Sequence, residues 1–179
     1  MDGFRSWFRL AAVAAAVSLV VVMQPAAQAT ARPAVSGGGV VAGPLGTTSQ
    51  LGITASPAGG HLLCVMAGRS GGFPFGPWRR IRQMQVSGPV TPGTLRVTGE
   101  VSSFAGVATI HVVGTTATGA EFVATVIGVP FVSSQHAGGA GVAWHELDVT
   151  LPDGAVSFGP AAMSSGHISV SEYRRGMTV

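Results

Sequence analysis

The chain has 179 residues and carries few charges: ten basic residues, all of them arginine, stand against seven acidic ones, for a net charge of +3. The pI near 10.5 reflects scarce acids rather than many bases, so the charge does not favour nucleic acid as a partner. A single cysteine excludes an intrachain disulfide.

Residues 1–29 are typical of a secretory signal peptide with a helical apolar centre. Arg5 and Arg9 precede an apolar run over residues 10–23, and Ala27 and Ala29 supply the small residues of a cleavage site. The run is shorter than the roughly 20 residues that span a bilayer, which disfavours the alternative of a membrane anchor. We therefore expect cleavage after Ala29, secretion to the extracellular space and no stable membrane span in the mature chain.

The remainder predicts a flexible leader over residues 30–36, one β-domain over residues 37–171 and a tail over residues 172–179. Its apolar runs are short, rich in Val, Ile, Thr and Phe, and interrupted by Gly, Pro and Ser. Eight to ten antiparallel strands indicate a sandwich or a barrel, and we expect an all-β sandwich, Ig-like or jelly-roll-like. The predicted strands cover residues 39–42, 50–55, 61–66, 81–87, 94–101, 107–113, 121–127, 142–151, 156–159 and 167–170.

Period-two alternation assigns faces to these strands. Cys64 shares a face with Leu62 and Met66, which predicts a buried, inert thiol; a reactive or intermolecularly paired thiol is the alternative. The expected core consists of Ile110, Val112, Phe122, Val126, Leu147, Val149 and Ile168.

Two connections read as loops and one as a hairpin turn. Residues 68–78 and residues 135–141 are rich in glycine and are expected to be exposed. The segment Pro152-Asp153-Gly154 lies between two predicted strands, and a glycine after aspartate accepts the positive φ of a tight turn, so the strands on either side should pair.

The segment Trp144-His145-Glu146-Leu147-Asp148 crowds one histidine and two acids together. It lacks the second histidine of the H-E-x-x-H zinc pattern, and on a strand His145 points away from Glu146 and Asp148. Two acids on one strand face can form a glycosidase pair, but they are more often solvated surface. We therefore expect no catalytic residue.

The five histidines are scattered, and none has the usual spacing of zinc ligands. Single surface or edge histidines, no metal and no cofactor are therefore expected, although a site assembled from distant strands stays open. Ser133, Ser134 and His136 lack the G-x-S-x-G pattern of a nucleophile elbow.

The densest basic segment runs from Pro77 to Gln83. An aromatic residue beside arginines can stack on and pair with an anionic polymer, whereas the alternative is a charged edge strand that resists pairing. The candidate ligand-binding residues are Phe75, Trp78, Arg79, Arg80 and Arg82.

Several motifs follow one another in a familiar order. They are Met84-Gln85-Val86-Ser87-Gly88, residues 106–114, residues 119–126, residues 147–151 and the closing Ser165-Gly166-His167-Ile168-Ser169-Val170. This succession resembles the post-COAP-1 domain of secreted bacterial proteins, which implies a β-rich extracellular module with no established enzymatic role. The family's acidic loop is replaced here by residues 128–131, so no cation-binding role carries over.

These observations predict a secreted, non-catalytic module that binds a ligand or associates with the cell envelope. Its partner is unknown; a cell-envelope polymer and another secreted protein are the candidates. A secreted hydrolase using Glu146, Asp148 or His136 is the alternative, and an assembly subunit with an unpaired sheet edge is a third.

Overall fold

The structure, a computed structural model, describes residues 34–42, 48–67, 78–116, 118–151 and 154–171. These residues form strands and turns, and no helix among them could span a membrane. The predicted signal peptide, the predicted tail from residue 172 and most of the predicted loop at residues 68–78 lie outside the described residues. The strands are β1 (Ala34–Ala42), β2 (Thr48–Ser56), β3 (Gly59–Ala67), β4 (Trp78–Val90), β5 (Arg96–Thr98), β6 (Val101–Thr116), β7 (Glu121–His136), β8 (Gly138–Gly139), β9 (Trp144–Leu151) and β10 (Gly154–Ser171).

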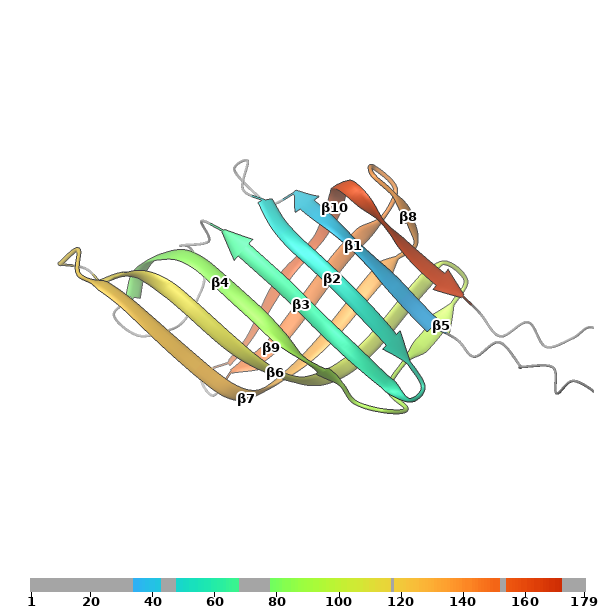
Figure 1. The fold of residues 1–179 in the computed structure, drawn as a ribbon, viewed down its shortest axis with the longest axis horizontal. Helices are drawn as coiled ribbons and strands as arrows, with labels where there is room; N and C mark the ends of the chain where they lie inside the picture. The colour runs from blue at the N-terminus through green and yellow to red at the C-terminus, as the bar shows by residue number, and fades with distance from the viewer. Residues whose placement is uncertain (1–33, 43–47, 68–77, 117, 152–153, 172–179) are drawn as a thin grey trace, which may run out of the picture.

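The prediction of a sandwich is wrong, because the strands close into one antiparallel barrel. Eight strands pair in the order β1-β2-β3-β4-β6-β7-β9-β10, and β10 pairs again with β1 (Figure 1). A sandwich and a barrel share the same succession of short amphipathic strands and turns. They differ in whether the sheet closes on itself, and here Ala34 to Val41 of β1 pair with Ser171 to Met163 of β10.

Several boundaries also differ from the predicted ones. The first strand begins at Ala34, inside the stretch expected to be a leader, and the predicted strand over residues 94–101 is split into β5 and the start of β6 by a turn at Gly99. The two short strands predicted over residues 156–159 and 167–170 are parts of the single long β10. The predicted hairpin is confirmed, since Leu151 pairs with Gly154.

Two inward-facing glycines allow the neighbouring strands β4 and β6 to approach each other closely. A Cβ atom on Gly88 of β4 would lie 2.2 Å from the backbone oxygen of Val107, and one on Gly106 of β6 would lie 2.2 Å from that of Pro89. The pairing of β4 with β6 is interrupted at this point, between Ser87 and Val90. Glycine thus allows the two backbones to approach where the sheet bends, as barrel closure requires.

The predicted faces are confirmed. Ile110, Val112, Leu147, Val149 and Ile168 are fully buried inside the barrel. Phe122 and Val126 also point inward but are only partly buried, packed against this core. The predicted burial of Cys64 beside Leu62 and Met66 is likewise confirmed.

The prediction of a loop over residues 135–141 is wrong for the first half of this segment. Gln135 and His136 belong to β7, and Gly138 and Gly139 form the short β8 beside β10. The long β7 continues there because Ser133 and Gln135, although polar, alternate with outward residues and fill the barrel interior.

Candidate functional site

His145 is the most unusual side chain of the barrel interior. On β9 it points inward with Leu147 and Val149, and it is only 4% exposed. Both ring nitrogens are buried without a hydrogen-bond partner. Desolvation by burial lowers the pKa of the imidazole from 6.5 to about 4, so the ring is neutral at physiological pH. The prediction of surface or edge histidines is therefore wrong for His145.

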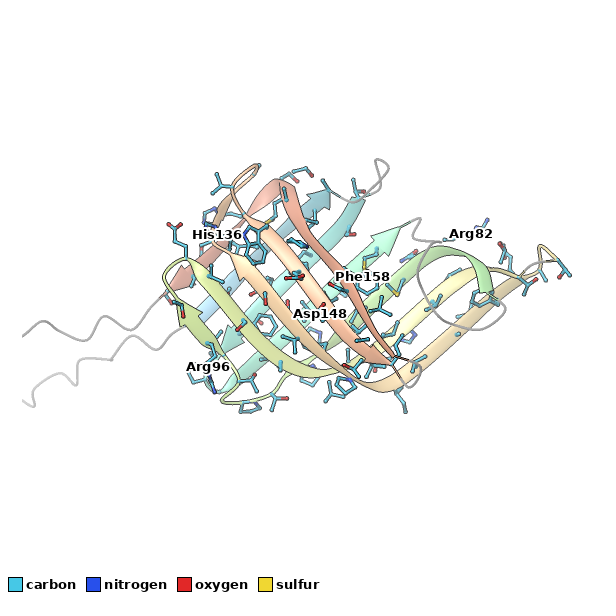
Figure 2. All side chains as sticks on the ribbon, turned by 180° about the vertical axis from the view of Figure 1, so that it is seen from behind. Arg82, Arg96, His136, Asp148 and Phe158 are labelled. Atoms are coloured by element: carbon cyan, nitrogen blue, oxygen red, sulfur yellow. The ribbon has the colours of Figure 1, made fainter. Side chains whose placement is uncertain are left out.

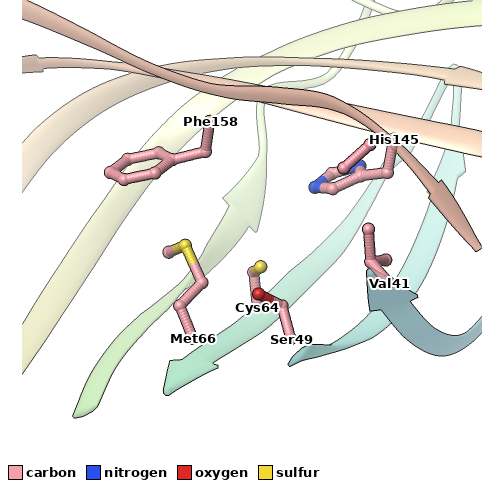
Figure 3. A pocket seen from close by; sticks show the side chains of 7 residues that line it. Val41, Ser49, Cys64, Met66, His145 and Phe158 are labelled. Atoms are coloured by element: carbon pink, nitrogen blue, oxygen red, sulfur yellow. The ribbon is translucent and has the colours of Figure 1, made fainter. Parts of the chain in front are cut away.

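The ring of His145 points into a small cavity inside the barrel (Figure 3). The cavity measures about 10 Å³, which is the space of roughly one water molecule and too little for an organic ligand or cofactor. It is bounded by residues of β1, β2, β3, β9 and β10, which are adjacent around the closed sheet. The lining residues are Val41, Ser49, Cys64, Met66, His145, Phe158 and Ala161.

The register explains why these side chains meet. Val41 pairs with Ser49, and Ser49 pairs with Met66 on the next strand, so the three form one row across β1, β2 and β3. Cys64 stands two residues before Met66 and therefore points to the same face. His145 enters from β9, where it pairs with Ala161 of β10.

The cavity combines an imidazole, a thiol, a thioether and a hydroxyl. Figure 3 shows Cys64 between Met66, whose sulfur lies below the ring of Phe158, and the ring of His145; all four side chains line the same cavity. No charged side chain lines this space. Sequence reasoning placed Cys64 and Met66 on one buried face but did not bring them to His145, because the sequence does not state that β3 and β9 face each other across a barrel.

The acids beside His145 lie elsewhere. Glu146 and Asp148 alternate with it on β9 and are half-buried on the outer face, as predicted. Among the described residues, no three His, Cys, Asp or Glu side chains gather into a cluster that could hold a metal ion.

Ser133 and His136 point to opposite faces of β7 and cannot act together. Ser133 is buried in a polar network: Gln135 Nε2 donates to Ser133 Oγ at 2.5 Å, and Ser102 Oγ donates to Gln135 Oε1 at 2.9 Å. His136 lies outside, with its Nε2 atom 3.5 Å from the Glu100 carboxylate. The network satisfies the buried polar groups, as barrel packing requires.

The candidate ligand-binding segment is described only in part. Phe75 lies outside the described residues, and Trp78, Arg79 and Arg80 belong to the start of β4, with side chains outside the description. Arg82 is exposed and forms an ion pair with Glu121 of β7. Figure 2 places Arg82 at the opposite end of the barrel's long axis from His136.

The first half of β7 forms a second candidate site, on the outer surface. Phe131 to His136 pair with β9, whereas Glu121 to Val129 pair, among the described strands, only with β6. The hairpin of β6 and β7 extends past β9 and β10 (Figure 1). Along this edge Val123 and Ile127 are 74% and 76% exposed. The nearly continuous apolar run over residues 122–132 was a signal that both faces of this strand are apolar.

No family model, curated protein or solved structure matches the chain. The resemblance to the post-COAP-1 domain therefore stays a prediction. Any function must follow from the chain's own residues.

Proposed function

We propose that this chain is a secreted, non-catalytic protein that associates with a second copy of itself through the first half of β7. The observation that carries the proposal is the incomplete pairing of β7, whose residues 121–129 have a strand on one side only among the described residues. Residues 154–162 of β10 also have one neighbour, β9, among the described strands. That stretch contains Pro160 and exposes no large apolar side chain, so it is a poorer edge for strand addition.

An unpaired strand edge presents backbone donors and acceptors that another strand can satisfy, and proteins commonly protect such edges with charge or proline. Here the centre of the edge has neither: Val123, Thr125 and Ile127 stand on its outer face. Pro130 protects only the end that lies next to β9. An exposed apolar edge of this kind favours strand addition.

A second copy suits this edge because an antiparallel pair of identical strands is related by a two-fold axis. Both copies then present the same patch, which is the commonest arrangement of homodimers. The only charge on the edge, Glu121, is already paired with Arg82 of its own chain. Neutral residues would therefore face each other near the axis, without repulsion between like charges.

The non-catalytic part of the proposal is supported by the scattering of polar groups. His145 and Ser133 lie inside the barrel, while His136, Glu146 and Asp148 lie outside it. A hydrolase needs nucleophile, base and acid within reach of one substrate atom. Secretion is supported by the sequence pattern of residues 1–29 alone.

The decisive experiment is sedimentation velocity of the purified mature chain over a range of concentrations. Ile127→Lys and Val123→Lys place charge on the edge and should weaken dimerisation by roughly tenfold or more in Kd. Leu63→Lys is the matched control: Leu63 is also outward-facing and 39% exposed, but its strand is paired on both sides.

A dimer that Ile127→Lys dissociates, and that Leu63→Lys leaves intact, supports the proposal. A chain that is monomeric at every concentration, or a dimer equally sensitive to Leu63→Lys, contradicts it. Hydrolytic activity that disappears in Glu146→Gln would contradict the non-catalytic part.

A further inference from the structure

We propose that the cavity beside His145 binds a single Cu(I) ion through the sulfur atoms of Cys64 and Met66 and one ring nitrogen of His145. The three donors come from two strands, β3 and β9, and line the same space (Figure 3). This site is separate from the β7 edge, and it does not depend on dimerisation.

His145 is the first observation that points to a ligand. Its two ring nitrogens are buried with no hydrogen-bond partner, and a buried polar group without a partner destabilises the folded state. The other inward-facing residues of β9 are apolar, and a leucine at position 145 would fill the same space without burying unpaired nitrogen atoms. An ion bound to one nitrogen would give the ring the partner that the protein does not supply.

The donor set selects the metal. Thiolate and thioether sulfurs are soft ligands that favour Cu(I), whereas Zn²⁺ sites use thiolate, imidazole and carboxylate but not thioether. Met66 is therefore the discriminating residue. Three donors match the low coordination number that a d¹⁰ monovalent ion accepts, and Ser49 adds only a neutral hydroxyl to the lining.

Charge balance leads to the same metal. Binding replaces the proton of the Cys64 thiol by Cu(I), which releases one proton and leaves the thiolate, the ion and the neutral imidazole with a net charge of zero. A Zn²⁺ ion on the same ligands would leave a net positive charge in a cavity with no charged side chain to offset it. Such an unpaired buried charge is strongly disfavoured.

The size and position of the cavity fit an ion. About 10 Å³ accommodates one particle of the size of a water molecule and no more. Val41 and Met66 stand one residue from the ends of β1 and β3, so the cavity lies near a rim of the barrel. An ion would therefore have a short path from the solvent.

The experiment is a Cu(I) titration of the mature full chain without oxygen, in competition with a chromophoric Cu(I) chelator. We expect one ion per chain and release of one proton, with copper–sulfur and copper–nitrogen scattering in X-ray absorption. We expect a loss of Cu(I) affinity of roughly 100-fold or more from each of three substitutions, Met66→Leu, Cys64→Ser and His145→Leu. Removing a residue that only orients a metal ligand already lowers metal affinity by about 10- to 100-fold, and removing a ligand itself should lower it at least as much.

Met84→Leu is the matched control, since Met84 is equally buried but lies on β4 and does not line the cavity. Each variant is first checked for folding by thermal melting without metal. Met66→Leu keeps volume and hydrophobicity, so it decides the question even where Cys64→Ser or His145→Leu fails to fold.

Absence of Cu(I) binding, or binding that Met66→Leu and Met84→Leu affect equally, would overturn the proposal and leave a water molecule as the occupant. Zn²⁺ binding as tight as that of Cu(I), and unaffected by Met66→Leu, would overturn it as well. Neither result depends on the oligomeric state, so failure here is distinguishable from failure of the dimer.

Discussion

At the scale of single residues, the barrel interior accepts polar side chains by two different means. Gln135, Ser133 and Ser102 satisfy one another by hydrogen bonds and are fully buried. His145 is buried without such a partner and stays neutral instead. A neutral imidazole avoids the large cost of burying a charge but still loses the hydrogen bonds that it made to water.

The neutrality of His145 makes the stability of the metal-free chain depend on pH. Burial lowers the pKa of His145 to about 4 in the folded chain, below the ordinary 6.5. Between pH 4 and pH 6.5 the unfolded chain binds more protons at His145 than the folded chain does. The contribution of the neutral imidazole to stability is therefore complete above pH 6.5 and is lost as the pH falls toward 4. The free energy of unfolding should drop by about 3 kcal/mol between pH 7.5 and pH 4 from this group.

Urea unfolding at the two pH values measures this loss, and His145→Leu supplies the comparison. The variant keeps an apolar side chain of similar size and has nothing to titrate, so most of the difference should disappear. The acidic groups are common to both chains and cancel. An equal loss of stability in both chains would show that the buried imidazole is not responsible.

At the scale of elements, the bend of β4 over β6 depends on the absence of side chains. Gly88 and Gly106 face inward at the point where the pairing of the two strands is interrupted, and each backbone closely approaches the other strand. A Cβ at either position would collide with a backbone carbonyl oxygen of the other strand. A flexible side chain could move aside to relieve such a collision, but a backbone oxygen held between two strands cannot. These glycines therefore set the curvature of the sheet.

A pair of glycine substitutions tests this role. Gly88→Ala should destabilise the fold by about 2–4 kcal/mol, because the new Cβ would lie 2.2 Å from the oxygen of Val107. Gly52→Ala, in β2, meets nothing within 4 Å and should be neutral or stabilising by roughly 0.5–1 kcal/mol. Thermal melting of both variants measures the contrast, and equal melting temperatures would refute the proposed bend.

At the scale of the whole molecule, closure joins segments from the two ends of the described chain. Val35 pairs with Val170, whereas Val112 pairs with Ala124 in a neighbouring strand. Val35 and Val112 are both buried. Only the contact of Val35 with β10 requires nearly the entire described chain to be in place. Contacts of such large sequence separation carry the greatest loop-closure entropy, so we expect them to form late in folding.

Matched valine truncations test the order of folding. Val35→Ala and Val112→Ala should each cost about 2–3 kcal/mol of stability through lost burial and the cavity left behind. In stopped-flow kinetics Val35→Ala should mainly accelerate unfolding, while Val112→Ala should mainly slow folding. The reverse assignment would mean that closure precedes the β6–β7 hairpin.

The local sequence pattern predicted much of the fold but little of the two candidate sites. The inward faces of β6, β9 and β10 were predictable, since Ile110, Leu147 and Ile168 alternate with outward residues. The merging of two predicted strands into β10 was not, because Gly159 and Pro160 read as a break while the ladder resumes after an irregularity. The unpaired edge of β7 was also hidden, because it depends on where β9 ends.

The sequence by itself determined an all-β chain, the hairpin between β9 and β10 and the direction of most side chains, because the alternation of Cβ atoms along a strand is a local property. Only the tertiary structure decided that the sheet closes into a barrel and that His145 meets Cys64 and Met66. Closure and that meeting depend on register and twist accumulated over many strands, and no short segment of sequence contains that sum.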